Sequence, residues 1–172
     1  MSRFSTATKI VSLLDRHLQI PVQDTMIRSL KADHLSFMKF GDGFISSIAM
    51  SFLITTPGGV SIYAMGDSAI FMDLQLFGQL YRPQVGLIPV GGFPGYFTEM
   101  SPREAALVAD WLGVGLAVPI HYVDNPENGE IFRQICRQTA PQVKVQILEP
   151  GQDLVLEPRP EIEPGCPDNE SE

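Results

Sequence analysis

Between residues 48 and 157, short apolar runs alternate with segments of helical periodicity, and this alternation constrains the fold more than any other feature. Apolar runs at 48–54 and 60–65 flank a Thr-Pro-Gly-Gly turn, a pattern typical of a β-hairpin. Further predicted elements follow: helix 72–81, strand 85–90, helix 102–112, strand 114–120, helix 131–138 and strands 143–148 and 153–157. Strands that alternate with helices predict an α/β fold, and periodicity alone favours a mostly parallel, layered sheet.

The clearest helix start is the run Ser101-Pro102-Arg103-Glu104. It supplies an N-cap serine, a proline at the first helical position and the glutamate of a capping box. Gly113 suits the left-handed residue just past the end of that helix. The helix predicted at 72–81 has one apolar face, made of Met72, Leu76, Phe77 and Leu80.

Composition narrows the class of protein. The chain has 172 residues, enough for one domain with a real core, and 44% are hydrophobic, which indicates a globular protein. A net charge of −8 and only 12 scattered Lys and Arg argue against nucleic-acid binding. No apolar run reaches the roughly 18–20 residues that span a bilayer, and the N-terminus lacks the apolar core of a signal peptide. Cys136 and Cys166 are too far apart to suggest a disulfide, so we expect a cytoplasmic protein.

We expect residues 1–157 to form a single domain and residues 158–172, rich in proline and acidic residues, to form a disordered tail. Residues 1–45 show little pattern, apart from a predicted helix at 9–18 that carries His17 on its surface.

Two polar residues stand where predicted strands end. Asp67 follows the strand 60–65 in a glycine-containing turn, a position where α/β folds commonly hold ligands; the alternative is that it caps the next segment through backbone amides. His121 ends the apolar strand 114–120, where an imidazole can bind a metal or act as a base; the alternative is a hydrogen-bonded structural histidine.

Gly91-Gly92 opens a glycine-rich loop that matches no phosphate-binding motif. We interpret these glycines as residues that need positive φ angles. Phe93, Tyr96 and Phe97, later in the loop, could wall a pocket or cover the sheet. The sequence has no Gly-x-Ser-x-Gly elbow, which argues against a serine hydrolase.

Five stretches in order carry a resemblance to a known family: 61–68, 78–92, 100–106, 117–122 and 148–152. Together they resemble the C-terminal half of metallo-β-lactamase-fold hydrolases, in the branch related to ascorbate-phosphate lactonase. The resemblance covers about 60% of the chain. It implies an αββα sandwich with mixed sheets, of which this truncated domain would supply one sheet and part of the other.

The resemblance also implies a metal site. Asp67 matches the family's metal-bridging aspartate and His121 its last histidine ligand. Such side chains suit Zn²⁺, Mn²⁺ or Fe, and in the family the metal activates a hydroxide that attacks an ester, lactone, phosphoester or amide.

The chain departs from the family at its other ligands. It has no His-x-His-x-Asp-His motif, and Ile45 stands near the place of a further histidine. His34, in the only Asp-His pair, is a further candidate ligand. Two ligands are fewer than the three or four protein ligands of a zinc site.

Three hypotheses follow. In the first, the chain is a metal-dependent hydrolase acting on a small molecule, with ligands supplied by a partner chain or by His34. In the second, it is an inactive half-fold that serves as a binding or oligomerisation module. In the third, it binds a small molecule through the loop at 93–97. Because strands 48–54 and 60–65 would leave an apolar face uncovered, we expect a homodimer or higher oligomer.

Overall fold

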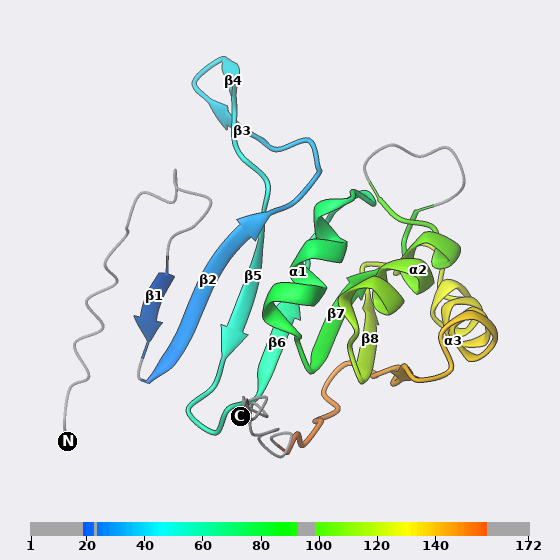
Figure 1. Ribbon diagram of the computed structural model, residues 1–172. Helices are drawn as coiled ribbons and strands as arrows, with labels where there is room; N and C mark the ends of the chain where they lie inside the picture. Colours follow the sequence, from blue (N-terminus) through cyan, green and yellow to red (C-terminus); the bar gives the residue numbers. More distant parts are fainter. Residues whose placement is uncertain (1–18, 23, 93–98, 158–172) are drawn as a thin grey trace, which may run out of the picture.

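The computed structural model describes residues 19–22, 24–92 and 99–157 (Figure 1). The helix predicted at 9–18 with His17, the aromatic residues at 93, 96 and 97, and the tail 158–172 lie outside the described residues. No helix in the described part is long and apolar enough to cross a membrane.

One seven-stranded sheet organises the chain, in the order β1-β2-β5-β6-β7-β8-β9. Its strands are β1 Gln19–Val22, β2 Thr25–Lys31, β5 Met50–Thr55, β6 Ser61–Ala64, β7 Val85–Pro89, β8 Leu116–Ile120 and β9 Lys144–Val145. Pairing from β1 to β6 is antiparallel and pairing from β6 to β9 is parallel. The expectation of a mostly parallel sheet was therefore wrong, because it left out the strands of the poorly patterned first 45 residues.

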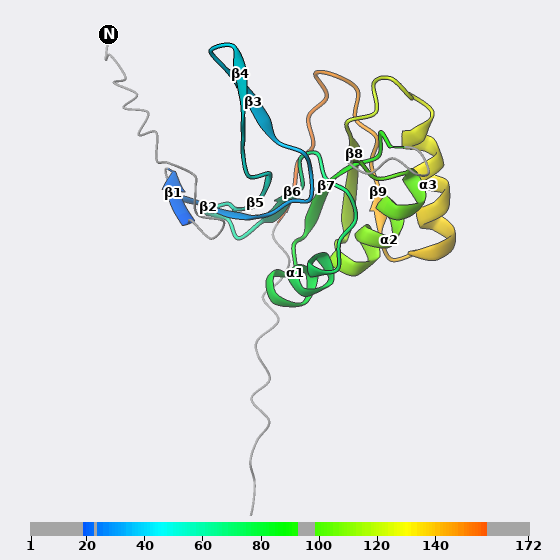
Figure 2. The same ribbon diagram turned by 90° about the horizontal axis from the view of Figure 1, so that it is seen from above.

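Three helices connect the parallel strands: α1 Asp73–Tyr81, α2 Pro102–Leu112 and α3 Asn128–Thr139. From β6 to β9, each strand in the sequence is the next strand in the sheet. Right-handed crossovers between strands added in one direction place every connecting helix on the same face. Figure 2 shows the three helices together on that face. The core forms between this face and the helices, with Leu53, Tyr63, Ile88, Val108 and Phe132 among its members.

The helix signals in the sequence were correct for α2. The Ser101 hydroxyl accepts from the Glu104 amide, the Glu104 carboxylate accepts from the Ser101 amide at 2.8 Å, and Gly113 adopts φ 64° after the last turn. The predicted apolar face of α1 was correct only for Phe77, which packs against the core. Leu74 and Gly78 are buried, whereas Met72, Leu76 and Leu80 are exposed.

The C-terminal strands were overestimated. Only Lys144–Val145 pairs with β8, and no strand forms at 153–157. Residues after β9 instead run along the face of the sheet opposite the helices (Figure 2). There the Gln84 side-chain amide donates to the carbonyl of Glu157 at 2.8 Å.

The face of the sheet opposite the helices, which we call the open face, is strongly apolar. Cross-strand pairing places two rows of side chains on it: Ile27, Ile54, Ile62, Val85 and Leu116 in one, and Ser29, Phe52, Ala64, Leu87 and Val118 in the other. No described helix covers these rows, and most of their members are half-buried. A sheet normally buries an apolar face against another layer. An uncovered apolar face is therefore typical of a surface that binds another layer or another molecule.

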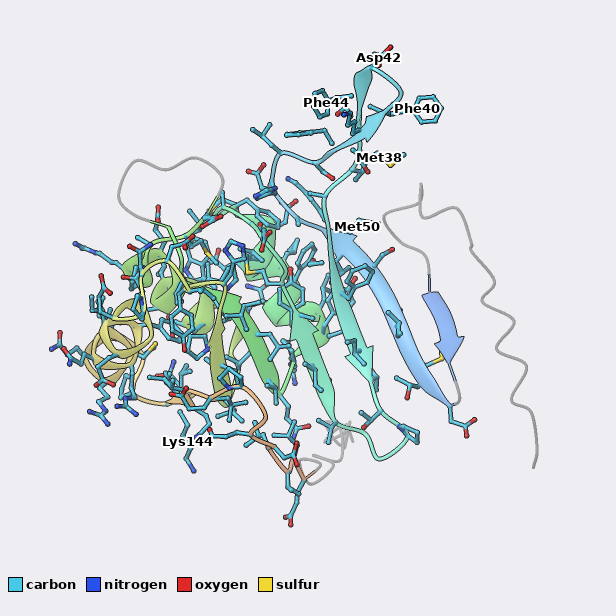
Figure 3. All side chains as sticks on the ribbon, turned by 180° about the vertical axis from the view of Figure 1, so that it is seen from behind. Met38, Phe40, Asp42, Phe44, Met50 and Lys144 are labelled. Carbon is cyan, nitrogen blue, oxygen red and sulfur yellow. The ribbon has the colours of Figure 1, made fainter. Side chains whose placement is uncertain are left out.

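A two-stranded hairpin, β3 Phe37–Phe40 and β4 Gly43–Ser46, projects from the ends of β2 and β5 (Figure 1). All eight strand residues are exposed. Figure 3 shows Phe40 and Phe44 on opposite sides of the ribbon and Asp42 at its tip. An isolated two-stranded ribbon is marginal in water, and this one is apolar on both sides.

Candidate metal centre

Asp67 lies where β6 ends. Gly66 has φ 65°, which turns the chain out of the strand immediately before the carboxylate. The turn is fixed behind Asp67 by Ser68, whose buried hydroxyl accepts from the Asp33 amide at 3.0 Å and donates to the Ala69 carbonyl at 2.9 Å. Within the described residues, the Asp67 side chain accepts no hydrogen bond from backbone amides of the next segment, and it is 44% exposed. The alternative role as a cap is therefore not supported by its contacts.

His121 lies where β8 ends, two strands away from β6. It adopts φ 57°, the left-handed region that costs a non-glycine residue about 1–3 kcal/mol and is often found at functional sites. The strand behind it is held by a hydrogen bond from the Val90 amide to the Ile120 carbonyl at 3.0 Å. Its imidazole is 46% exposed.

The structure brings the side chains of these two residues together. The distance from Asp67 Oδ1 to His121 Nε2 is 3.4 Å. Strands that flank a common neighbour stand about 9–10 Å apart, so the two side chains must reach toward each other across the end of the middle strand, β7. Both strands run parallel to β7, and both deliver their residue at its carboxyl end.

Gly91-Gly92 occupies the end of β7, and here the reason for the glycines differs from the sequence interpretation. Neither has a positive φ angle. A Cβ at Gly91 would lie 2.0 Å from the His121 carbonyl oxygen and 3.0 Å from Glu99 Oε2. A Cβ at Gly92 would lie 2.5 Å from the Glu99 carbonyl oxygen. Close approach of two other backbone segments, rather than backbone conformation, requires the glycines.

Glu99 is the site residue that sequence reasoning missed. Its Oε1 lies 3.5 Å from His121 Nδ1, and its side chain is only 19% exposed. The segment is held on β7 by a hydrogen bond from the Gly92 amide to the Met100 carbonyl at 2.9 Å. The sequence shows an acidic residue after a strand, but only the structure shows that this strand, β7, lies between those of Asp67 and His121.

The Asp67–His121 pair fits two ligands of one divalent ion. Two atoms each about 2.0–2.1 Å from a tetrahedral zinc are about 3.3–3.4 Å apart, close to the 3.4 Å found here. Among the described residues, however, no group of three or more His, Cys, Asp or Glu side chains could hold a metal ion. Glu99 faces the other ring nitrogen of His121, so it does not complete the set from this side.

His34, the further candidate ligand, lines a different hollow. It lies at the base of the hairpin with Phe37 and Phe44, and its Nδ1 contacts the Leu35 carbonyl at 2.5 Å. In the described part of the chain, no hydrogen bond or ion pair joins it to Asp67 or His121.

A hollow of about 340 Å³ opens beside His121. It is lined by Gly91, Glu99, His121, Tyr122, Val123, Asp124 and Asn125. The side-chain amide of Asn125 donates to the Gly91 carbonyl at 3.3 Å, and this bond links the loop after β8 to the end of β7. Burial, and secondarily the negative charge of Glu149, raise the pKa of Tyr122, so its hydroxyl remains a proton donor at neutral pH.

Comparison with curated proteins finds relatives with one common name. A UPF0173 metal-dependent hydrolase of Methanoculleus marisnigri is 42% identical over 121 residues, which cover 69% of this chain and 51% of that protein. A protein of the same name from Caldivirga maquilingensis is 42% identical over 110 residues, or 62% of this chain and 46% of that protein. The chain spans about half the length of these relatives. No family model matches it.

Solved structures share the fold. Igni18, a metallo hydrolase from Ignicoccus hospitalis, aligns with a TM-score of 0.67 and 25% identity over 84% of this chain and 60% of that chain. YhfI from Bacillus subtilis, a metallo-β-lactamase fold protein, aligns with a TM-score of 0.57 over 78% of this chain and 51% of that chain. At 15% identity, YhfI supports the fold alone.

Proposed function

The chain is a relative of the UPF0173 metal-dependent hydrolases with a metallo-β-lactamase fold, and on this premise we propose that it forms one part of a hydrolase centre in which Asp67 and His121 bind a divalent ion. The observation that carries the proposal is the 3.4 Å distance between Asp67 Oδ1 and His121 Nε2 at the ends of two parallel strands. The names of the relatives support metal dependence without identifying the metal. We propose Zn²⁺ or Mn²⁺, which both accept carboxylate and imidazole ligands.

A divalent ion at this position would act as a Lewis acid and would activate water for attack on an ester, lactone or phosphoester. The chain's own residues support such a reaction around it. Asp67 supplies negative charge that attracts the cation. A small-molecule substrate would occupy the adjoining hollow, which Gly91, His121 and Asn125 line.

Asp67 and His121 are two ligands, and no third ligand joins them among the described residues, whereas zinc sites use three or four. We propose that a second copy of the chain completes the centre and that the open face and the hairpin form the dimer interface. Six large apolar side chains of the hairpin region are 44–69% exposed: Leu35, Phe37, Met38, Phe40, Phe44 and Ile45. Together they expose on the order of 600 Å². With the open face, this approaches the ~800 Å² per partner of a stable interface.

Metal binding tests the hydrolase proposal. Purified protein is assayed for bound metal by mass spectrometry and titrated with Zn²⁺, and the same is done for Asp67→Ala and His121→Ala. We expect both variants to lose the metal. Asp153→Ala, which removes a carboxylate at an exposed position elsewhere, is the matched control and should keep the metal. A parent protein that takes up no metal would contradict the proposal.

The second candidate function is a binding or oligomerisation module without catalysis, favoured by the apolar open face and hairpin. Light scattering after size-exclusion chromatography separates the outcomes. A dimer that binds no metal supports the module, a dimer with metal supports the hydrolase, and a clean monomer contradicts the proposed assembly.

A further inference from the structure

We infer that Glu99 is a positioning residue: its carboxylate holds the ring proton of His121 on Nδ1, so that the lone pair of Nε2 faces Asp67. The inference deepens the proposed function and rests on it only for the role of the ion. It concerns the contact of Glu99 Oε1 with His121 Nδ1 at 3.5 Å, on the side of the ring opposite Asp67.

A neutral imidazole carries its single proton on one of two nitrogens and offers the other as an acceptor or ligand. In this site each nitrogen faces a carboxylate, at 3.4 Å for Asp67 and 3.5 Å for Glu99. The two differ in burial, because the Asp67 side chain is 44% exposed and that of Glu99 is 19% exposed. A less solvated carboxylate acts through a lower effective dielectric constant, so Glu99 attracts the proton more strongly.

The backbone around Glu99 is arranged for this contact. Gly91 lacks the Cβ that would press on Glu99 Oε2 at 3.0 Å and on the His121 carbonyl at 2.0 Å. Gly92 lacks the Cβ that would meet the Glu99 carbonyl at 2.5 Å. The two glycines therefore leave room for both Glu99 and His121 at the end of β7. The 3.5 Å separation exceeds a hydrogen-bond distance, so the contact at this geometry is electrostatic.

A proton held on Nδ1 has a consequence for metal binding. Ligand histidines commonly donate their second N–H to a carboxylate, which fixes the tautomer and the ring orientation. In this chain Asp67 and Nε2 would then present two unprotonated donors to one ion. Glu99 would act on the ion through His121 without touching it.

The test is the tautomer of His121 in the full chain, measured without metal by long-range ¹⁵N–¹H correlation at alkaline pH, where the imidazole is neutral. His121 signals are identified by their loss in His121→Ala. We expect the Nδ1–H tautomer to predominate in the parent protein and the Nε2–H tautomer to gain in Glu99→Ala. Asp153→Ala removes an exposed charge elsewhere and should leave the tautomer unchanged. A parent protein that favours Nε2–H, or a ratio unaffected by Glu99→Ala, overturns the inference.

A Zn²⁺ titration supplies the second readout. We expect Glu99→Ala to weaken Zn²⁺ affinity about 10–100-fold and Glu99→Gln, whose amide oxygen keeps a partial negative charge facing Nδ1–H, to cause a smaller loss. If Gln is as damaging as Ala while the tautomer stays unchanged, Glu99 is a ligand and the positioning role is wrong. If the parent protein binds no Zn²⁺, the hydrolase proposal fails, whereas the metal-free tautomer measurement still decides the role of Glu99.

Discussion

The two halves of the sheet differ in how completely the described chain covers them. From β6 to β9, three helices pack on one face and the residues after β9 run along the other. From β1 to β5, the open face bears apolar rows that no described helix covers, and a hairpin apolar on both sides rises from the strand ends. The half from β6 to β9 has the packing of a self-sufficient folding unit. The half from β1 to β5 has the exposed apolar surface of a binding interface. Mutations between β6 and β9 should therefore change folding stability, and mutations between β1 and β5 should change association.

The largest loss of unfolding free energy that tests this contrast should come from Leu74→Ala. Leu74 on α1 is fully buried, so truncation removes apolar contacts and leaves a cavity, and we expect a loss of about 3–4 kcal/mol in unfolding free energy. Urea unfolding followed by circular dichroism measures it. Leu76→Ala, two residues along and 51% exposed, is the matched control and should cost less than about 0.5 kcal/mol. Equal losses in the two variants would show that α1 packs by the other face.

Gly78→Ala should be the next most damaging change. A Cβ at Gly78 would lie 2.1 Å from the Trp111 carbonyl oxygen and 2.8 Å from the Leu112 Cα, so α1 and α2 would have to move apart. We expect a loss of about 2–3 kcal/mol, because overpacking outweighs the better helix propensity of alanine. Thermal unfolding measures it. Gln79→Ala, at an exposed position of the same helix, should be close to neutral; a stabilised Gly78→Ala protein would mean that the helices are not in such close contact.

The face of α1 illustrates what the sequence could and could not predict. The existence of α1 and the capping of α2 follow from local periodicity and cap residues, and both were predicted. Which face of α1 packs inward depends on Gly78, whose missing side chain lets α2 approach; the apolar stripe of exposed residues pointed the other way. A stripe of apolar residues shows where burial would help, not where it occurs in a single chain.

Some residues of the candidate site could likewise be predicted from the sequence, and others could not. Asp67 and His121 were found because each follows an apolar strand, and strand ends are readable from sequence. Glu99 was missed because its role depends on β7 lying between β6 and β8, and strand order is a property of the whole sheet. Strands β3 and β4 were missed because all their residues are exposed, so no buried–exposed alternation marks them. Strand β2 was missed because one of its partners, β5, lies beyond this hairpin in the chain, and such a pairing leaves no local pattern.

A smaller effect is expected at the start of α2. Ser101→Ala removes the hydroxyl that accepts from the Glu104 amide and donates to its carboxylate at 2.7 Å, so we expect a loss of about 1 kcal/mol. Chemical denaturation measures it. Ser101→Thr preserves the hydroxyl and should recover most of the stability. Because the cap lies in the half that folds by itself, the variant should leave the oligomeric state unchanged, and a shift toward monomer would break the proposed division.

The smallest effect on folding, and the sharpest test of the contrast, should come from Phe40→Ser in the hairpin. The Phe40 side chain is 68% exposed, so its loss should change the unfolding free energy of a monomer by less than about 0.5 kcal/mol. If the hairpin is part of a dimer interface, the same change removes a large aromatic contact and should shift the dimer toward monomer in analytical ultracentrifugation. Lys39→Ser, an exposed substitution on the same strand, is the matched control and should leave the dimer in place. A Phe40→Ser protein that associates as tightly as the parent would show that this side of the hairpin does not contribute to the interface.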